Sequence, residues 1–289
     1  MKNDKKDIEY LDGTFITPSD DRAVMLSSGL FYGAGCFETI RVEKCLILQY
    51  HDHMSRLYRG LHYLGINKVH FPELDEIKQT ILQLIEINHL NHAVCRARVQ
   101  CFLTEKSGYH IDVNNRLLLH ISVEEVFDDD KPVRLITTET RVVPTVCRPS
   151  DLKLSNMLHY RNARREALSK QVDDGLMLTI DNYVAETSIA NIFWKKDGVI
   201  YTPSIDCDIL PGTMRNLVIK LLTHIKQIKV NEGKFRKEEI IHSELVWVTN
   251  SILECKVVSE LDGKELNYDH KFFLSLMNKL MAFKKNKME

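Results

Sequence analysis

The stretch DLKLSNMLHYRNARREA, residues Asp151–Ala167, sets one lysine, Lys153, just ahead of a polar Ser-Asn step and a helix-forming run over Asn162 to Val172. Pro144 and Pro149 mark an irregular approach to it. Most lysines are solvated surface amines. An amine that is partly removed from water has a lowered pKa and can attack a carbonyl group to form a Schiff base. The rest of the chain decides which interpretation applies to Lys153.

Composition limits the class of protein. The chain has 289 residues, of which 44% are apolar and 27% charged, which is ordinary for a globular protein of about two domains. A formal net charge of −1 argues against nucleic acid or an anionic membrane as a partner. The seven cysteines form no CxxC pair, which favours reduced thiols. With no signal peptide and no membrane-spanning run in view, we expect a cytoplasmic protein.

Strands and helices alternate along the first half of the chain, as the spacing of its apolar residues indicates. The expected elements are a hairpin at Asp12-Gly13, a glycine-rich approach over Ser27–Glu38, a strand over Phe37–Val42, a helix capped by Asp52, a helix over Glu73–Ile87, and strands over Ala93–Leu103 and Arg116–Val126. A charge run that ends in a proline, residues 128–132, is the expected interdomain linker. We therefore place an N-terminal α/β domain over 1–127 and a C-terminal domain over 133–289.

The expected strand over Ala93–Leu103 divides its side chains between two faces. Small and apolar residues share one face, whereas Arg96, Arg98 and Gln100 share the other. Two arginines on one face would bind a carboxylate substrate or pair with acids across a subunit contact. The sequence leaves both interpretations open.

Three polar features stand in the second half of the chain. Glu186 lies among small residues, and a carboxylate in so apolar a segment needs a partner such as a protonated ring nitrogen or backbone amides. Pro-Gly-Thr at 211–213 precedes an amphipathic helix, whose first amides make a phosphate site or an ordinary cap. Residues 249–251 end an apolar strand and form a second candidate cradle or a plain turn.

Six blocks, taken in order and at their spacing, resemble the class IV pyridoxal-phosphate enzymes. This fold type IV group contains branched-chain aminotransferases, D-amino-acid aminotransferases and aminodeoxychorismate lyases. The blocks are FYGAGCFETIRV (31–42), HMSRL (53–57), KLSN (153–156), AETSIANIFW (185–194), ILPGTMR (209–215) and TNS (249–251). The resemblance implies an α/β (α+β) fold of two domains with pyridoxal 5′-phosphate at their interface. It also implies a homodimer and places the lysine in the C-terminal domain.

The resemblance assigns roles to individual residues. Lys153 looks like the Schiff-base lysine, Glu186 matches the acid that keeps the pyridine nitrogen protonated, and Arg56 matches the phosphate-binding arginine. The other expected phosphate-site residues are Gly212, Thr213, Thr249, Asn250 and Ser251. Tyr32 and Phe37 are candidate pocket walls or core residues. A protonated ring is an electron sink for charge at the substrate's Cα, and the freed lysine amine can move the Cα proton. No metal is expected.

The residues around Lys153 leave the substrate open. Branched-chain aminotransferases carry a tyrosine shortly after the Lys-Asn step, where this chain has Met157 and Leu158, closer to the lyase pattern. The lyases carry a glycine-rich Arg-Gly turn, whereas Phe102–Tyr109 has one glycine and no arginine. The Arg and His that mark D-amino-acid aminotransferases are not evident.

Three functions follow from these departures. Our first expectation is an aminotransferase for a small, branched-chain-like amino acid and a 2-oxo acid. The second is a 4-amino-4-deoxychorismate lyase that releases pyruvate and 4-aminobenzoate. The third is a non-catalytic relative, which would bind no cofactor.

Overall fold

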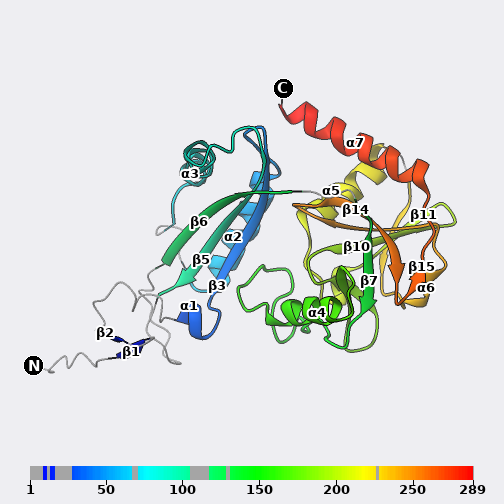
Figure 1. Ribbon diagram of the computed structural model, residues 1–289, viewed down its shortest axis with the longest axis horizontal. Coiled ribbons are helices and arrows are strands. Elements are labelled where there is room, and N and C mark those ends of the chain that lie inside the picture. The colour runs from blue at the N-terminus through cyan, green and yellow to red at the C-terminus, as the bar shows by residue number, and fades with distance from the viewer. Residues whose placement is uncertain are drawn as a thin grey trace, which may run out of the picture.

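Two β-sheets, each with its own helices, lie side by side in the protein (Figure 1). The structure is a computed structural model that describes residues 9–11, 14–16, 28–66, 71–104, 117–127, 131–225 and 228–288. A separate antiparallel hairpin of β1 (Glu9–Leu11) and β2 (Thr14–Ile16) confirms the hairpin predicted there, although its turn lies outside the described residues. Within the described ranges, no helix combines the length and hydrophobicity that a membrane crossing requires.

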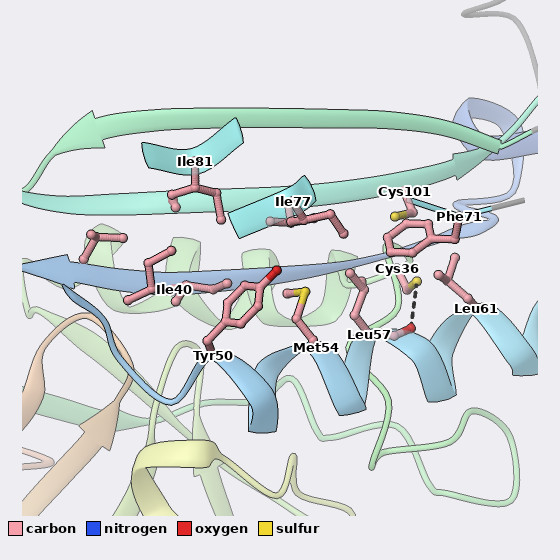
Figure 2. Packing of buried hydrophobic residues seen from close by; sticks show 14 of the residues in the cluster. Cys36, Ile40, Tyr50, Met54, Leu57, Leu61, Phe71, Ile77, Ile81 and Cys101 are labelled. Atoms are coloured by element: carbon pink, nitrogen blue, oxygen red, sulfur yellow. Dashed lines mark hydrogen bonds between the residues drawn. The ribbon is translucent and has the colours of Figure 1, made fainter. Parts of the chain in front are cut away.

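The first sheet has four antiparallel strands in the order β4-β3-β5-β6. Its strands are β3 (Gly35–Glu43), β4 (Leu46–Ile47), β5 (Val94–Leu103) and β6 (Leu117–Glu125), and the helices beside it are α1 (Ser28–Phe31), α2 (Tyr50–Tyr63) and α3 (Leu74–Ile87). Both α2 and α3 pack on one face. Figure 2 shows Met54 and Leu57 of α2 pointing at the strands, with Ile77 and Ile81 of α3 in the same cluster.

Alternation along β5 follows the prediction. The small and apolar residues from Ala93 to Leu103 are buried toward α2 and α3, while Arg96 and Arg98 lie on the opposite face. Helix α2 differs from its prediction, because it begins at Tyr50 with Gln49 as its N-cap, and Asp52 lies in the first turn. One face of the first sheet thus packs against α2 and α3, and the opposite face carries polar side chains such as Arg96 and Arg98.

The second sheet is mixed and has nine strands, in the order β12-β11-β10-β13-β14-β7-β8-β9 with β15 paired to β14. Its strands are β7 (Val133–Thr137), β8 (Asp174–Leu178), β9 (Val184–Thr187), β10 (Asn191–Lys196), β11 (Val199–Pro203), β12 (Val230–Gly233), β13 (Leu245–Asn250), β14 (Glu254–Leu261) and β15 (Lys264–Glu265). Its helices are α4 (Leu158–Ser169), α5 (Thr213–Lys220), α6 (Glu238–Ile241) and α7 (His270–Met288), with a 3₁₀ turn at Ile205–Cys207 and a π turn at Leu221–Ile225.

Helix α4 begins at Leu158 and ends at Ser169, whereas the sequence predicted Asn162 to Val172. The prediction was wrong at the first turn because the N-cap, Met157, has no side-chain cap bond and so gives no sequence signal. The domain boundary at 128–132 stays a proposal. Residues 128–130 lie outside the described residues, although the chain passes from the first sheet to the second between Glu125 and Val133.

The segment that carries Lys153 is fastened to the first sheet. Among the described strands, β4 pairs only with the far end of β3, which leaves the other end of β3 open on that side. Leu154 bridges to Cys36 there, with the N–H of Phe37 donating to the Lys153 carbonyl over 2.9 Å and the N–H of Ser155 donating to the Gly35 carbonyl over 2.8 Å. Backbone bonds therefore hold Lys153 between the two sheets.

Candidate active site

A cavity of about 780 Å³ is lined by residues of both sheets and collects most of the predicted site residues. Those that line it are Phe37, Arg56, Arg96, Arg98, Lys153, Glu186, Gly212, Thr249, Asn250 and Ser251. Tyr32 is 46% exposed and Thr213 is buried, and neither is a lining residue. Among the described residues, no group of three or more His, Cys, Asp or Glu side chains is arranged to hold a metal ion.

Lys153 carries an amine with an unusual protonation equilibrium. Its Nζ lies 5.0 Å from the centroid of the Phe37 ring. Burial lowers the pKa of the amine to about 8, and the positive charge of Arg56 acts in the same direction against Glu38 and Glu186. A large fraction of the amine is therefore neutral near pH 8, and only the neutral amine is nucleophilic.

Three hydrogen bonds fix the carboxyl group of Glu186. The Tyr160 hydroxyl donates to Oε1 over 2.5 Å, and the backbone N–H of Leu210 donates to the same oxygen over 3.1 Å. Asn191 Nδ2 donates to Oε2 over 2.9 Å. Burial outweighs these donors and raises the pKa of Glu186 to about 7. A carboxyl group so poorly hydrated would be stabilised as an anion by a cationic ring nitrogen beside it.

A second buried carboxylate, Glu38, holds Arg56, which lines the cavity. It accepts bonds from Arg56 Nε over 2.7 Å and Nη2 over 2.8 Å, and from His53 Nδ1 over 2.7 Å. Burial would raise the pKa of Glu38, but the charges and hydrogen bonds of Arg56 and His53 outweigh it and lower the pKa to about 2. Arg56 also donates from Nη1 to the Pro211 carbonyl over 3.1 Å. The arginine is thereby fixed in direction at the edge of the cavity.

Hydroxyl groups gather where α5 begins. Thr213 Oγ1 lies 3.2 Å from Ser251 Oγ, and His53 Nε2 lies within 3.3 Å of both. The Thr249 hydroxyl is buried and has no hydrogen-bond partner among the described residues. The first N–H groups of a helix lack intrahelical partners and favour an anion. An unsatisfied buried hydroxyl that lines the same cavity as Ser251 and Gly212, the N-cap of a helix, fits a phosphate group, which accepts several hydrogen bonds. We call Thr213, Thr249 and Ser251 the hydroxyl cluster.

The helix start differs in one detail from the sequence prediction. Gly212 is the N-cap of α5, and Thr213 is the first helical residue. The Thr213 side chain makes no cap bond and instead joins the hydroxyl cluster. Thr213 therefore belongs to the cluster although it does not line the cavity.

The two arginines of β5 differ in their surroundings. Arg96 forms an exposed ion pair with Glu124 of β6. Arg98 stacks over the Phe37 ring with its Cζ 3.9 Å from the centroid, and donates to Gln100 Oε1 over 2.7 Å. Burial lowers the pKa of Arg98, and Arg96 adds to this effect. Since Arg98 lines the cavity and forms no ion pair with an acid in the described part of the chain, it suits an acidic ligand better than Arg96.

Sequence reasoning missed Tyr160, Asn191, Glu38 and His53. Each is a hydrogen-bond partner of another site residue, and each contact joins separate elements. A signal did exist for Glu38, His53 and Asn191, because all three fall inside blocks that carry the family resemblance. Tyr160 lies outside those blocks and is oriented only by the true start of α4.

Gly212→Ala is expected to destabilise the protein by about 1–3 kcal/mol and to loosen Glu186. A Cβ at this position would lie 2.2 Å from Asn191 Oδ1. Asn191 cannot swing away without losing its bonds to Glu186 and to the Leu210 carbonyl. Thermal unfolding of the variant measures the cost. In an Asn191→Ala background the cost of Gly212→Ala should nearly vanish, and an undiminished cost there would show that another contact is responsible.

Comparison with known proteins identifies relatives that cover most of the chain. A sequence profile of the family described as amino-transferase class IV matches residues 35–261. The aminodeoxychorismate lyase of Bacillus subtilis (strain 168) is 29% identical over 265 residues, covering 90% of this chain and 87% of the relative. The branched-chain-amino-acid aminotransferase of Escherichia coli (strain K12) is 25% identical over 286 residues, covering 91% of this chain and 87% of the relative.

A solved structure shows the same fold. The branched-chain aminotransferase from the thermophilic archaeon Thermoproteus uzoniensis, crystallised with norvaline, superposes with a TM-score of 0.81 at 23% identity. The superposition covers 95% of this chain and 93% of that one. The α/β fold predicted from the sequence is confirmed.

Proposed function

Since this chain belongs to the class IV aminotransferase family, whose profile spans residues 35–261, we propose that it is a pyridoxal-phosphate-dependent aminotransferase. It would transfer an amino group between a small, branched-chain-like amino acid and a 2-oxo acid. The observation that supports this most is one cavity holding a lysine amine of pKa about 8 and a fixed carboxyl group of pKa about 7, next to a hydroxyl cluster at a helix start.

The cavity residues suit the parts of pyridoxal phosphate. The hydroxyl cluster, the start of α5 and Arg56 would hold the phosphate group. Glu186 would face the ring nitrogen, and Lys153 would hold the aldehyde carbon. When bound, this cofactor supplies an electron sink for negative charge at the Cα of an amino acid.

The chain's own residues would manage the proton and the substrate. The Lys153 amine would take the proton from the substrate Cα, and a pKa of about 8 keeps a large fraction of this amine neutral near pH 8. Arg98 would orient the substrate carboxylate from the β5 side. Met157, Ile189 and Leu253 also line the cavity and suit an apolar side chain.

A lyase of the same family is the second candidate. It is favoured by the 29% identity to the aminodeoxychorismate lyase of Bacillus subtilis and by the absence of a tyrosine at Met157 and Leu158. Such an enzyme would use the same lysine and phosphate site but release pyruvate from 4-amino-4-deoxychorismate. The two proposals differ in one measurable respect. An aminotransferase would transfer the amino group of an amino acid to the cofactor, and a lyase would not.

We expect the cofactor-loaded protein to accept an amino group from an amino acid when no 2-oxo acid is present. Each L- and D-amino acid is mixed with the protein, and the released cofactor is separated by chromatography. Conversion of pyridoxal phosphate to pyridoxamine phosphate, fastest with a branched-chain donor, is the expected result. No conversion with any donor, together with pyruvate release from aminodeoxychorismate, would make the lyase correct. A purified protein that takes up no cofactor would be the non-catalytic relative.

A further inference from the structure

The hairpin loop between β13 and β14 connects the hydroxyl cluster to a distant part of the molecule. Residues 251–253 line the cavity, and the loop places Ser251 Oγ beside Thr213. Asn250 Oδ1 accepts the N–H groups of Ile252 over 2.9 Å and Leu253 over 2.7 Å, which sets the shape of the loop. Its position relative to the first sheet depends on other contacts.

One of these contacts crosses between the two sheets. Arg41, on β3 of the first sheet, donates from Nη1 to the Ile252 carbonyl over 2.6 Å. Arg41 is 8% exposed, so this bond is largely shielded from water. A buried charged donor on a carbonyl is stronger than an ordinary hydrogen bond and fixes a definite geometry. The middle of the loop is therefore tied to β3.

A second contact comes from the last helix. Lys284 Nζ lies 2.9 and 3.1 Å from the two carboxylate oxygens of Glu254, the residue that directly follows the loop, and 2.7 Å from Glu43 Oε2 on β3. Figure 1 shows the C-terminal end of α7 reaching toward the first sheet. Glu254 has a φ of 58°, in the left-handed region that is uncommon for a non-glycine residue.

Arg41, Glu254 and Lys284, which are buried, form one ion cluster with Glu43, whose side chain is 22% exposed. Arg41 Nε completes it at 3.6 Å from Glu43 Oε2 and 3.9 Å from Glu254 Oε1. Its formal charges balance. The free energy lost when charges leave water offsets most of the Coulomb attraction within a buried ion pair, so such a cluster adds little to the stability of the fold. It is better suited to holding its members in a single arrangement.

We propose that Arg41 and Lys284 are positioning residues for the cofactor's phosphate group. They fix the 251–253 loop from two sides, and with it the hydroxyl cluster, so that helix α7 takes part in phosphate binding from a distance. Without them the loop would still form its Asn250 bonds, but Ser251 would no longer be held against Thr213. This inference rests on the proposed function, because it requires the cluster to bind the cofactor's phosphate.

Pyridoxal phosphate and pyridoxal, which lacks the phosphate, distinguish positioning from general stabilisation. Full-length protein is stripped of cofactor and titrated with each compound, with intrinsic tryptophan fluorescence as the signal. Lys284→Met should weaken pyridoxal phosphate binding about tenfold or more while changing pyridoxal binding less than about twofold. Lys284→Arg should restore most of the affinity. Lys285→Met, at the exposed neighbouring position, should leave both affinities unchanged.

The outcomes separate cleanly. Equal loss of affinity for both compounds, or no loss for either, overturns the positioning role. If Lys284→Met does not fold, Arg41→Lys carries the test, because it keeps the charge but cannot reach both carboxylates and the Ile252 carbonyl at once. It should show the same phosphate-selective loss, and unchanged binding would overturn the proposal. Wild-type protein that binds no pyridoxal phosphate would instead contradict the proposed function itself.

Discussion

Lys153→Ala is expected to reduce turnover by about 10³-fold or more and to abolish the absorbance that marks cofactor covalently attached to the protein. The substitution removes the nucleophilic amine of the cavity and the group assigned to move the Cα proton. Neither role can pass to Arg56 or Arg98, because a guanidinium group stays protonated at any working pH. The measurements are the absorbance spectrum of the reconstituted protein and the steady-state rate.

A matched control is the exposed Lys170, at the end of α4 and outside the cavity. Lys170→Ala should retain the spectrum and rate of the wild type. Reduction of the loaded wild-type protein with borohydride, followed by peptide mapping, should place the attached cofactor on Lys153. Attachment that persists in Lys153→Ala, with activity, would mean that another lysine performs this chemistry.

The same amine should affect the stability of the cofactor-free protein. Burial lowers its folded-state pKa to about 8, whereas its unfolded value is 10.5, so between these values the unfolded chain binds more protons. The contribution of this amine to stability therefore rises with pH across that window, and below it the buried charge is a constant penalty. Lys153→Met should accordingly unfold at a higher temperature than the wild type at pH 7. The difference should shrink as the pH approaches 10.5.

The site residues that could be predicted from the sequence are those in short blocks. Lys153, Glu186 and residues 249–251 each stand in such a block, and local backbone structure carries them to the cavity. Strand faces were equally accessible, because a period of two places Arg96 and Arg98 together without tertiary information. These features depend on neighbours within a few residues.

The remaining site residues depend on contacts between distant segments, and a single sequence gives no local pattern that predicts such contacts. In the sequence, Glu38 is an ordinary residue of a predicted strand. Its role follows only from the structure, in which Arg56 and His53 of α2 bind its carboxylate. Arg41 and Lys284 stand at opposite ends of the chain and share a cluster only because both sheets and α7 converge there. Tyr160 was missed for a simpler reason, since the predicted helix began at Asn162 and left Tyr160 outside it, whereas α4 begins at Leu158.

Glu186→Gln is expected to leave the cofactor bound but to reduce turnover by about 10²- to 10³-fold. The amide keeps the size of the side chain and can still accept from Tyr160 and Leu210, but it removes the negative charge that would keep the ring nitrogen protonated. Its NH₂ group would meet Asn191 Nδ2, another donor, so that bond is lost as well. Turnover and the bound cofactor's spectrum are measured together.

A measurement without cofactor separates this role from a structural one. The folded-state pKa of Glu186 is about 7 against an unfolded value of 4.5, so the folded protein binds more protons between those values and its stability falls as pH rises through them. Glu186→Gln should lack that fall and gain stability relative to the wild type up to pH 7. Tyr160→Phe keeps the charge but removes a donor, so it should extend the fall to higher pH at its upper end and reduce turnover only about tenfold. Full turnover in Glu186→Gln, with this pH signature present, would mean that the carboxyl group is buried at an energetic cost without controlling the ring. A loss far larger than that of Tyr160→Phe would show that the charge, rather than the hydrogen-bond network around it, is what the reaction requires.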